Sequence, residues 1–159
     1  MGAKAETLAK QFETKVQEAT KLLEKLSDAD WKKITSAEKW PVCVVAHHIA
    51  MSHEGIGNLL KSAASGQHKP SIGMSDIDQM NAKHAQDFAT VGKAETLALH
   101  KKNAAAAAAM VRGLDDAALA RSASALKGIP SMTAEQAVTG ILCGHIDEHI
   151  GSIKKTVSA

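Results

Sequence analysis

The chain has 159 residues, the length of one ordinary domain that can bury a sizeable hydrophobic core. Hydrophobic residues make up 45% of the sequence and aromatic residues only 3%, so we expect a core of Ala, Val, Leu, Ile and Met, as in packed helices. The formal net charge is +2 without a long Lys/Arg run, and two Trp and two Phe cannot supply rows of stacking surfaces. The composition therefore argues against β-sheets and against nucleic acid as a partner.

The cysteines and the first residues bear on the cellular compartment. Cys43 and Cys143 are far apart in the sequence and each lies inside a predicted helix, so we expect reduced thiols rather than a disulfide. The opening sequence MGAKAETLAKQFETKV lacks the apolar core of a signal peptide, and no apolar run approaches the roughly 18 residues of a membrane span. We therefore expect a cytoplasmic protein that does not bind membranes.

The first half of the chain contains two predicted helices. Residues 4–27 place apolar side chains at steps of three and four with Lys and Glu between them, which predicts an amphipathic helix. Ser and Asp in the segment 28–40 indicate a link, and Pro41 suits the first turn of a second helix at 41–65. The Gly, Pro and Ser residues of the stretch SGQHKPSIGMS, 65–75, then predict a loop of about ten residues.

A third long helix begins near Ser75. We expect the sequence TVGK at 90–93 to interrupt or bend this helix, which then resumes over 94–112. The alanine run at 104–109 lies in the resumed part and indicates that two helix backbones approach each other closely.

The last part of the chain is a connector followed by a helix. Residues 113–133 are expected to be irregular apart from one short helix at 115–121. Thr133 and Gln136 form a capping-box pair, which predicts the start of a last helix over 134–157.

Together these elements predict an all-α fold. Four long amphipathic helices without a strand pattern or an internal repeat favour a four-helix bundle, with a short extra helix or irregular connector between the third and fourth long helices. We expect a single domain over residues 1–159, with its functional sites between facing helices.

Two histidines in the sequence GHIDEHIG, residues 144–151, stand among isoleucines. At about 100° per residue, His145 and His149 fall within the apolar arc of the last helix, while Asp147 points outward and Glu148 lies on a shoulder of the arc. A spacing of i and i+4 places two imidazoles on one side of a helix, where they can reach one metal ion. The pattern alone is less specific than HExxH, because no general base follows the first histidine.

The second helix supplies further histidines. His48 and His53 lie on the two shoulders of its apolar face, whereas His47 is expected to point to the opposite side. A third imidazole from a facing helix, His48, would complete a metal site that keeps coordination positions open for water or substrate. The alternative is that each inward histidine lies at the edge of the core and bonds to a carbonyl or a neighbouring side chain.

Other residues are candidates for roles around this site. On the third helix, His84 and Asn81 could hydrogen-bond a substrate or a water at the metal, or could instead pair with each other. His53 or Glu54 could orient a ligand imidazole. Substrate contacts are assigned to Asn81, His53, Glu54 and Trp40, and catalytic roles to His84 and Glu148 as candidate bases.

Three residues are expected to have no part in the site. We interpret Cys143 as a buried, small apolar residue. His68 and His100 are interpreted as ordinary loop and surface residues.

Several stretches resemble the DinB-like (DNA-damage-inducible) superfamily. Its members open their second helix with Trp and a small residue, place a His eight residues after that Trp, and end in HxxxH. The stretches WPVCVVAHHIAMSHE, in which His48 stands eight residues after Trp40, and GHIDEHIGSI follow this pattern. LSDADW, NAKHA and VRGLDDAAL also resemble pieces of the family, so the resemblance covers nearly the whole chain.

The resemblance implies a four-helix bundle, often dimeric, with a divalent metal held by three histidines, here His48, His145 and His149. Relatives include thiol-dependent enzymes, such as the mycothiol-dependent maleylpyruvate isomerase and the bacillithiol or glutathione transferases, and members without an assigned reaction. Some thiol-dependent relatives carry an acidic residue within the triad, whereas this chain has His at all three positions. This difference weakens a transfer of the isomerase activity in particular.

These observations lead to two functional hypotheses. The first is an enzyme in which a divalent metal, Zn²⁺ or Ni²⁺, activates a small thiol or water for transfer to, or hydrolysis of, a small electrophile between the second, third and fourth helices. Because no acidic residue falls inside the arc beside His145 and His149, a thiol is favoured over water as the nucleophile. The second hypothesis is a stress-associated protein that binds a metal or ligand without turnover. The expected partners are a small-molecule substrate and a second copy of the chain in a homodimer.

Overall fold

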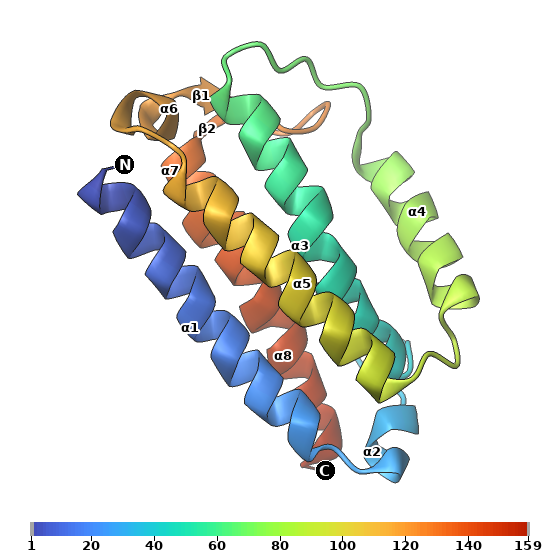
Figure 1. The fold of residues 1–159 in the computed structure, drawn as a ribbon. Helices are drawn as coiled ribbons and strands as arrows, with labels where there is room; N and C mark the ends of the chain where they lie inside the picture. Colours follow the sequence, from blue (N-terminus) through green and yellow to red (C-terminus); the bar gives the residue numbers. More distant parts are fainter. Residues whose placement is uncertain (1, 159) are drawn as a thin grey trace.

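Four long helices form a bundle in the computed structural model, which describes residues 2–158 (Figure 1). They are α1 (Ala3–Lys25), α3 (Val42–Ala64), α5 (Lys93–Arg112) and α8 (Gly144–Val157). The predicted all-α bundle is therefore confirmed. Within the described residues, no helix is long and apolar enough to cross a membrane.

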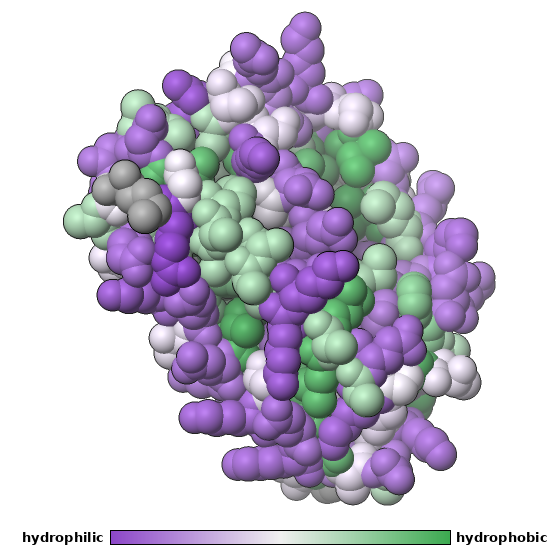
Figure 2. All heavy atoms as spheres, in the orientation of Figure 1, coloured by the Kyte–Doolittle hydropathy of each residue, from purple (hydrophilic) through white to green (hydrophobic). Residues whose placement is uncertain are grey.

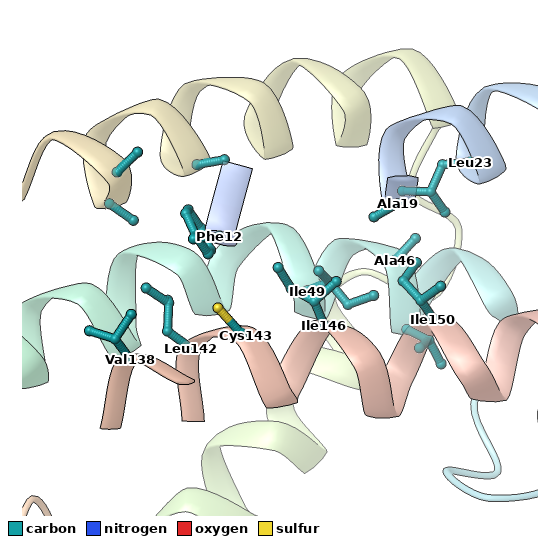
Figure 3. Packing of buried hydrophobic residues seen from close by; sticks show 14 of the residues in the cluster. Phe12, Ala19, Leu23, Ala46, Ile49, Val138, Leu142, Cys143, Ile146 and Ile150 are labelled. Atoms are coloured by element: carbon teal, nitrogen blue, oxygen red, sulfur yellow. The ribbon is translucent and has the colours of Figure 1, made fainter. Parts of the chain in front are cut away.

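The labelled side chains at the centre of the bundle come from α1, α3, α8 and residues 138–143 just before α8, and buried residues of α5 belong to the same core (Figure 3). Phe12 on α1, Ile49 on α3 and Ile146 on α8 are almost completely buried there. Cys143 is buried in the same cluster, as predicted, and neither Cys43 nor Cys143 forms a disulfide. Hydrophilic side chains cover most of the face seen in Figure 2, and apolar atoms show between them. The apolar stripes read from the sequence thus point into one shared core.

The alanine run of α5 packs against α3. Ala104, Ala107 and Ala108 are buried, whereas Ala105 and Ala106 are exposed. A Cβ added to Gly57 on α3 would lie only 3.7 Å from the Ala107 Cβ. The small side chains therefore allow the close approach of two helix backbones that the sequence predicts.

The third predicted helix is divided into two separate helices. The sequence TVGK lies at the break: α4 (Met74–Asp87) ends before it, and α5 starts at Lys93 after the extended residue Gly92. The Trp31 Nε1–H donates a 2.9 Å hydrogen bond to the Val91 carbonyl and ties the break to the segment before α3. Only α5 joins the bundle, while α4 stands outside it beside α3 (Figure 1). His84 is the one residue of α4 that is fully buried, because this helix carries few large apolar side chains.

Short elements complete the chain. The helix α6 (Asp116–Ala120) is capped by Asp115 and confirms the predicted short helix in the connector. A one-turn helix, α2 (Asp28–Lys32), was not predicted, although Ser27 and Asp30 form a capping box at its start. Two-residue strands β1 (Ser122–Ala123) and β2 (Met132–Thr133) pair antiparallel, and they are too short to leave a periodic pattern in the sequence.

The last predicted helix changes from α-helical to π-helical geometry and back along its length. It starts as α7 (Ala134–Ala137) at the predicted capping box of Thr133 and Gln136. A π-helical segment (Val138–Cys143) follows before α8 begins at Gly144. A π turn holds more residues than an α turn. The step of about 100° per residue, used to place side chains around the last helix, is therefore correct only from Gly144 onward. Such segments are frequent at functional sites, and this one directly precedes His145.

Candidate metal centre

Three histidines from two helices meet at the side of the bundle. His48 comes from α3, and His145 and His149 come from consecutive turns of α8. One nitrogen from each ring lies within 4.8 Å of the others, and the Nε2 atoms of His48 and His145 are 3.0 Å apart. The structure therefore brings together the three residues that the sequence singles out as candidate ligands.

Local packing holds these imidazoles in place. On α8, Ile146, Ile150 and Ile153 are buried in the core and fix the rotation of the helix. The two histidines occupy the neighbouring face, where their ring centroids are 4.4 Å apart. Trp40, just before α3, packs its ring edge-on against the ring of His48 on α3, with 5.5 Å between ring centroids.

The environment keeps two of the three imidazoles neutral. Burial, and then the neighbouring His145 and His149, lower the pKa of His48 to about 3. Burial, and then His149 and His53, lower the pKa of His145 to about 3. Both rings are therefore uncharged near pH 7, and each offers the nitrogen lone pair that a metal ligand needs.

An acidic residue that the sequence analysis missed completes the site. The His149 Nδ1–H donates to Glu38 Oε1 at 2.8 Å, and the Ser152 hydroxyl donates to Glu38 Oε2 at 2.6 Å. Burial alone would raise the pKa of Glu38, but the hydrogen bonds from Ser152, His149 and Thr35 outweigh burial and lower it. The carboxylate is thus charged near neutral pH, and the bond from Nδ1 leaves the Nε2 lone pair of His149 available to a metal.

Glu38 reaches the site through the loop between α2 and α3. The loop is closed by the hydrogen bond from the Thr35 N–H to the Trp40 carbonyl, at 2.9 Å. Lys39 adopts a left-handed conformation, with φ of 64°, which turns the chain directly after Glu38. The acid comes from a loop, so no periodic pattern marked it. Its position just before Trp40 and Pro41, where α3 begins, was the only available signal.

The donor set fits a divalent transition metal. Nitrogen ligands stand about 2.0–2.1 Å from Zn²⁺, so tetrahedral neighbours lie about 3.4 Å apart. The 3.0 Å distance between the His48 and His145 nitrogens is near this spacing. Two nitrogens 4.8 Å apart would reach it if rotation of the imidazoles brought them roughly 1 to 1.5 Å closer together. The bond from His149 to Glu38 matches the carboxylate partner that metal-binding histidines commonly have. Three nitrogen ligands leave a further coordination position for an exogenous group.

Two other predicted residues lie beside the triad. Trp40 is half-buried against His48, as described above. His84 is buried, and its ring centroid lies 5.8 Å from that of His48. Asn81 is half-buried one turn before His84, and among residues 2–158 its side chain forms no hydrogen bond with His84. The proposed pairing of Asn81 with His84 is therefore wrong.

Among the described residues, the remaining predicted side chains form no hydrogen bond with the triad. Glu54 and Glu148 are exposed to solvent, and Glu148 lines a surface hollow with Ser152 and Lys155. His53 is buried, but its Nε2 lies 3.0 Å from His100 Nδ1 rather than at a triad imidazole. The structure thus brings Glu38, and not His53 or Glu54, to a ligand histidine.

Two expectations about other histidines are wrong. His47 was expected to point away from the protein interior, but it is 2% exposed and its Nδ1 lies 2.8 Å from His84 Nε2. His100 was expected at the surface, but it is completely buried and its Nε2 lies 3.1 Å from the Thr20 hydroxyl. In both cases a second helix covers the face that a single helix would show to water: α4 covers His47, and α1 and α3 cover His100.

Solved structures with the same fold provide a comparison. YfiT from Bacillus subtilis, described as a probable metal-dependent hydrolase with an unusual four-helix bundle topology, matches with a TM-score of 0.79 and 20% identity. The match covers 99% of this chain and 89% of YfiT. The mycothiol-dependent maleylpyruvate isomerase matches with a TM-score of 0.75 and 14% identity over 96% of this chain. This chain spans only 63% of the isomerase chain.

Sequence comparisons gave different results for individual proteins and for the family. No curated protein sequence matches the chain. The family model of the DinB superfamily, in contrast, matches residues 11–153, which include the three histidines and Glu38. Because this match spans most of its length, the chain belongs to the DinB superfamily.

Proposed function

We propose that this protein is a metal-dependent enzyme that acts on a small electrophile at the site formed by His48, His145 and His149. The observation that carries the proposal is the hydrogen bond from His149 to Glu38 beside two neutral imidazoles. That arrangement presents three nitrogen donors to one point and fixes the tautomer of one of them. A set of three protein ligands, rather than four, supports a reactive site over a structural one.

Each part of the site has a role in this proposal. A Zn²⁺ or Ni²⁺ ion held by the triad would supply the positive charge that favours the deprotonated form of a bound thiol or water. Glu38 orients His149 and compensates part of that charge. Trp40 and His84 border His48, and in this proposal they contact the substrate.

A thiol remains our preferred nucleophile. Glu38 is hydrogen-bonded to the triad, but the hydrogen bonds from Ser152, His149 and Thr35 lower its pKa, which makes it a poor base for a proton from water. A thiol bound to a metal loses its proton without a base and needs no such group. The thiol dependence named for the isomerase supports this choice, whereas the description of YfiT as a probable hydrolase supports water.

Metal content is the first test. Purified, untagged protein is expected to contain close to one transition-metal ion per chain by elemental analysis, and His145→Ala and His149→Ala are expected to lose it. His68→Ala is the control, because His68 bonds to Ser62 and to the Ala125 carbonyl away from the triad. Unchanged metal content in both α8 variants would refute the site.

Cobalt spectroscopy then separates the two nucleophiles. We expect a sulfur-to-cobalt absorption band when Co²⁺-loaded protein is titrated with glutathione, bacillithiol or mycothiol. Absence of the band with all three thiols, together with ester or amide hydrolysis that disappears in His48→Ala, would favour the hydrolase. Absence of both signals would favour the binding protein without turnover.

A further inference from the structure

His84 carries an unpaired nitrogen next to the candidate metal centre. Among the described residues, its Nδ1 is the one buried side-chain nitrogen or oxygen without a hydrogen-bond partner. The residue as a whole is only 9% exposed, so bulk water does not solvate this atom freely. Burying such an atom without a partner costs free energy, and native proteins rarely leave one unpaired without a reason. A bound group that pairs with it would remove this cost.

The neighbouring residues hold the His84 ring in its orientation. Its Nε2 lies 2.8 Å from His47 Nδ1, and His47 itself is 2% exposed. Phe88 stacks on His47 with 3.9 Å between ring centroids and also contacts His84. A flip of the His84 ring would place carbon atoms at both nitrogen positions and break the bond to His47. The unpaired Nδ1 is therefore kept in place by the bond on the opposite side of the ring.

The position of His84 suggests where its partner would bind. The ring packs edge-on against the ring of His48, with 5.8 Å between centroids. On another side, His48 contacts the candidate ligand His145. A group bound near His48 would thus lie in the neighbourhood of the unpaired nitrogen.

The charge of the metal centre indicates which kind of group would bind next to His84. A divalent cation held by neutral imidazoles leaves a net positive charge even after Glu38 is counted. Such a centre favours anions, and an anionic oxygen, sulfur or nitrogen offers only hydrogen-bond acceptors. A neutral imidazole carries one N–H, and its other nitrogen accepts a hydrogen bond. For an anion, that proton must be on Nδ1, and His47 Nδ1–H must then donate to His84 Nε2.

We propose that His84 Nδ1–H donates a hydrogen bond to a small anionic group, such as a carboxylate or thiolate, bound beside His48. His47 is a positioning residue that fixes the tautomer of His84 from the other side. This inference rests on the proposed function, because the metal supplies the positive charge. It adds a specificity-determining contact from α4, the helix outside the bundle, to a site otherwise formed by α3, α8 and the loop with Glu38.

Two substitutions distinguish the two nitrogens of His84. The amide nitrogen of Asn can occupy the position of Nδ1, whereas the amide of Gln reaches the position of Nε2 and leaves Nδ1 without a substitute. We would titrate Co²⁺-loaded protein with azide as the probe and follow the azide-to-cobalt absorption. His84→Gln is expected to weaken azide binding about tenfold or more, as for a lost hydrogen bond to a charged group, while His84→Asn stays within about threefold of the wild type. Gln86→Asn, an exposed change on the same helix, is the control.

Each outcome of the titration decides the proposal. Full cobalt content with equal azide affinity in all variants overturns it, and so does an equal loss in the Gln and Asn variants, which would show a structural role of the ring. Weaker binding in the Asn variant than in the Gln variant overturns it as well. Absence of cobalt from the wild type overturns the proposed function together with this inference.

The tautomer provides a second, independent measurement. In ¹⁵N-histidine-labelled, Zn²⁺-loaded protein with azide, long-range ¹H–¹⁵N correlation spectra report which nitrogen of each neutral ring is protonated. We expect the proton of His84 on Nδ1 and that of His47 on its own Nδ1. A bare Nδ1 on His84 in the azide complex overturns the proposal.

Discussion

At the scale of single residues, the site depends on how each imidazole divides its two nitrogens between partners. In His149, one nitrogen donates to Glu38 and the other remains available to a metal. His84 divides its nitrogens between His47 and, in our proposal, an anion. Each hydrogen bond fixes a tautomer, and the tautomer decides the chemistry of the opposite nitrogen.

Glu38 can be tested separately from the three ligands. Glu38→Gln keeps the size of the side chain but removes the charge that holds the His149 tautomer. We expect metal affinity to fall about 10- to 100-fold, the usual effect of removing such a partner. Competition with a chelator of known affinity measures the change. The matched control is Glu148→Gln, because Glu148 is exposed on the same helix as His149. Equal losses in the two variants would contradict a specific role of Glu38.

At the scale of elements, two neighbouring segments of the chain behave differently. α5 is rich in Ala and packs closely on α3, and it forms part of the bundle. α4 has one fully buried residue and stays outside. Among its contacts with α3 are those of His84 and Phe88 with His47. These contacts also bring His84 to the candidate metal centre.

The close packing of α5 on α3 predicts the cost of a larger side chain. Ala107→Leu is expected to lower the free energy of unfolding by about 1–3 kcal/mol, because the added carbons would overlap α3 near Gly57. Urea denaturation measures this difference. Ala106→Leu lies in the same alanine run but is exposed, and its effect should stay within about 0.5 kcal/mol. If the two variants were equally stable, the close contact would be wrong.

At the scale of the whole molecule, the number of buried histidines predicts sensitivity to acid. The pair of His53 and His100 joins α3, α5 and α1 in the core. Burial, and then the charge of His100, lower the pKa of His53 to about 3. Burial also lowers the pKa of His100 and outweighs the opposing hydrogen bond with the Val16 carbonyl. Both rings are therefore neutral in the folded protein, and protonation favours the unfolded chain.

The sign of the pH dependence follows from these shifts. Between an unfolded pKa of about 6.5 and the lowered folded pKa, the unfolded chain binds more protons, so stability is complete above about pH 6.5 and declines toward pH 3. Each such histidine contributes a slope of up to about 1.4 kcal/mol per pH unit. In metal-free protein, His53→Leu combined with His100→Leu should reduce the slope of unfolding free energy between pH 6.5 and 5. Urea titrations at several pH values measure the slope, with Ala106→Leu as a control that changes no titrating group. An unchanged slope in the double variant would contradict the lowered pKa values.

The sequence by itself determined the long helices and the three-histidine motif. Apolar spacing, capping residues and the i, i+4 pair of His145 and His149 are local features, because the geometry of one helix decides which side chains share a face. The same reasoning correctly located the interruption at TVGK and the alanine contact of α5. Family resemblance and helix geometry agreed on His48, and the structure places it beside the pair.

Only the tertiary structure decided which groups surround that motif. Glu38 comes from a loop, and its approach to His149 depends on the turn at Lys39, for which no periodic pattern exists. The pairing of His47 with His84 depends on α4 leaving the bundle, and the burial of His100 depends on α1 and α3 lying against α5. A face that looks exposed on one helix is buried when another helix covers it, and this depends on contacts between residues distant in sequence.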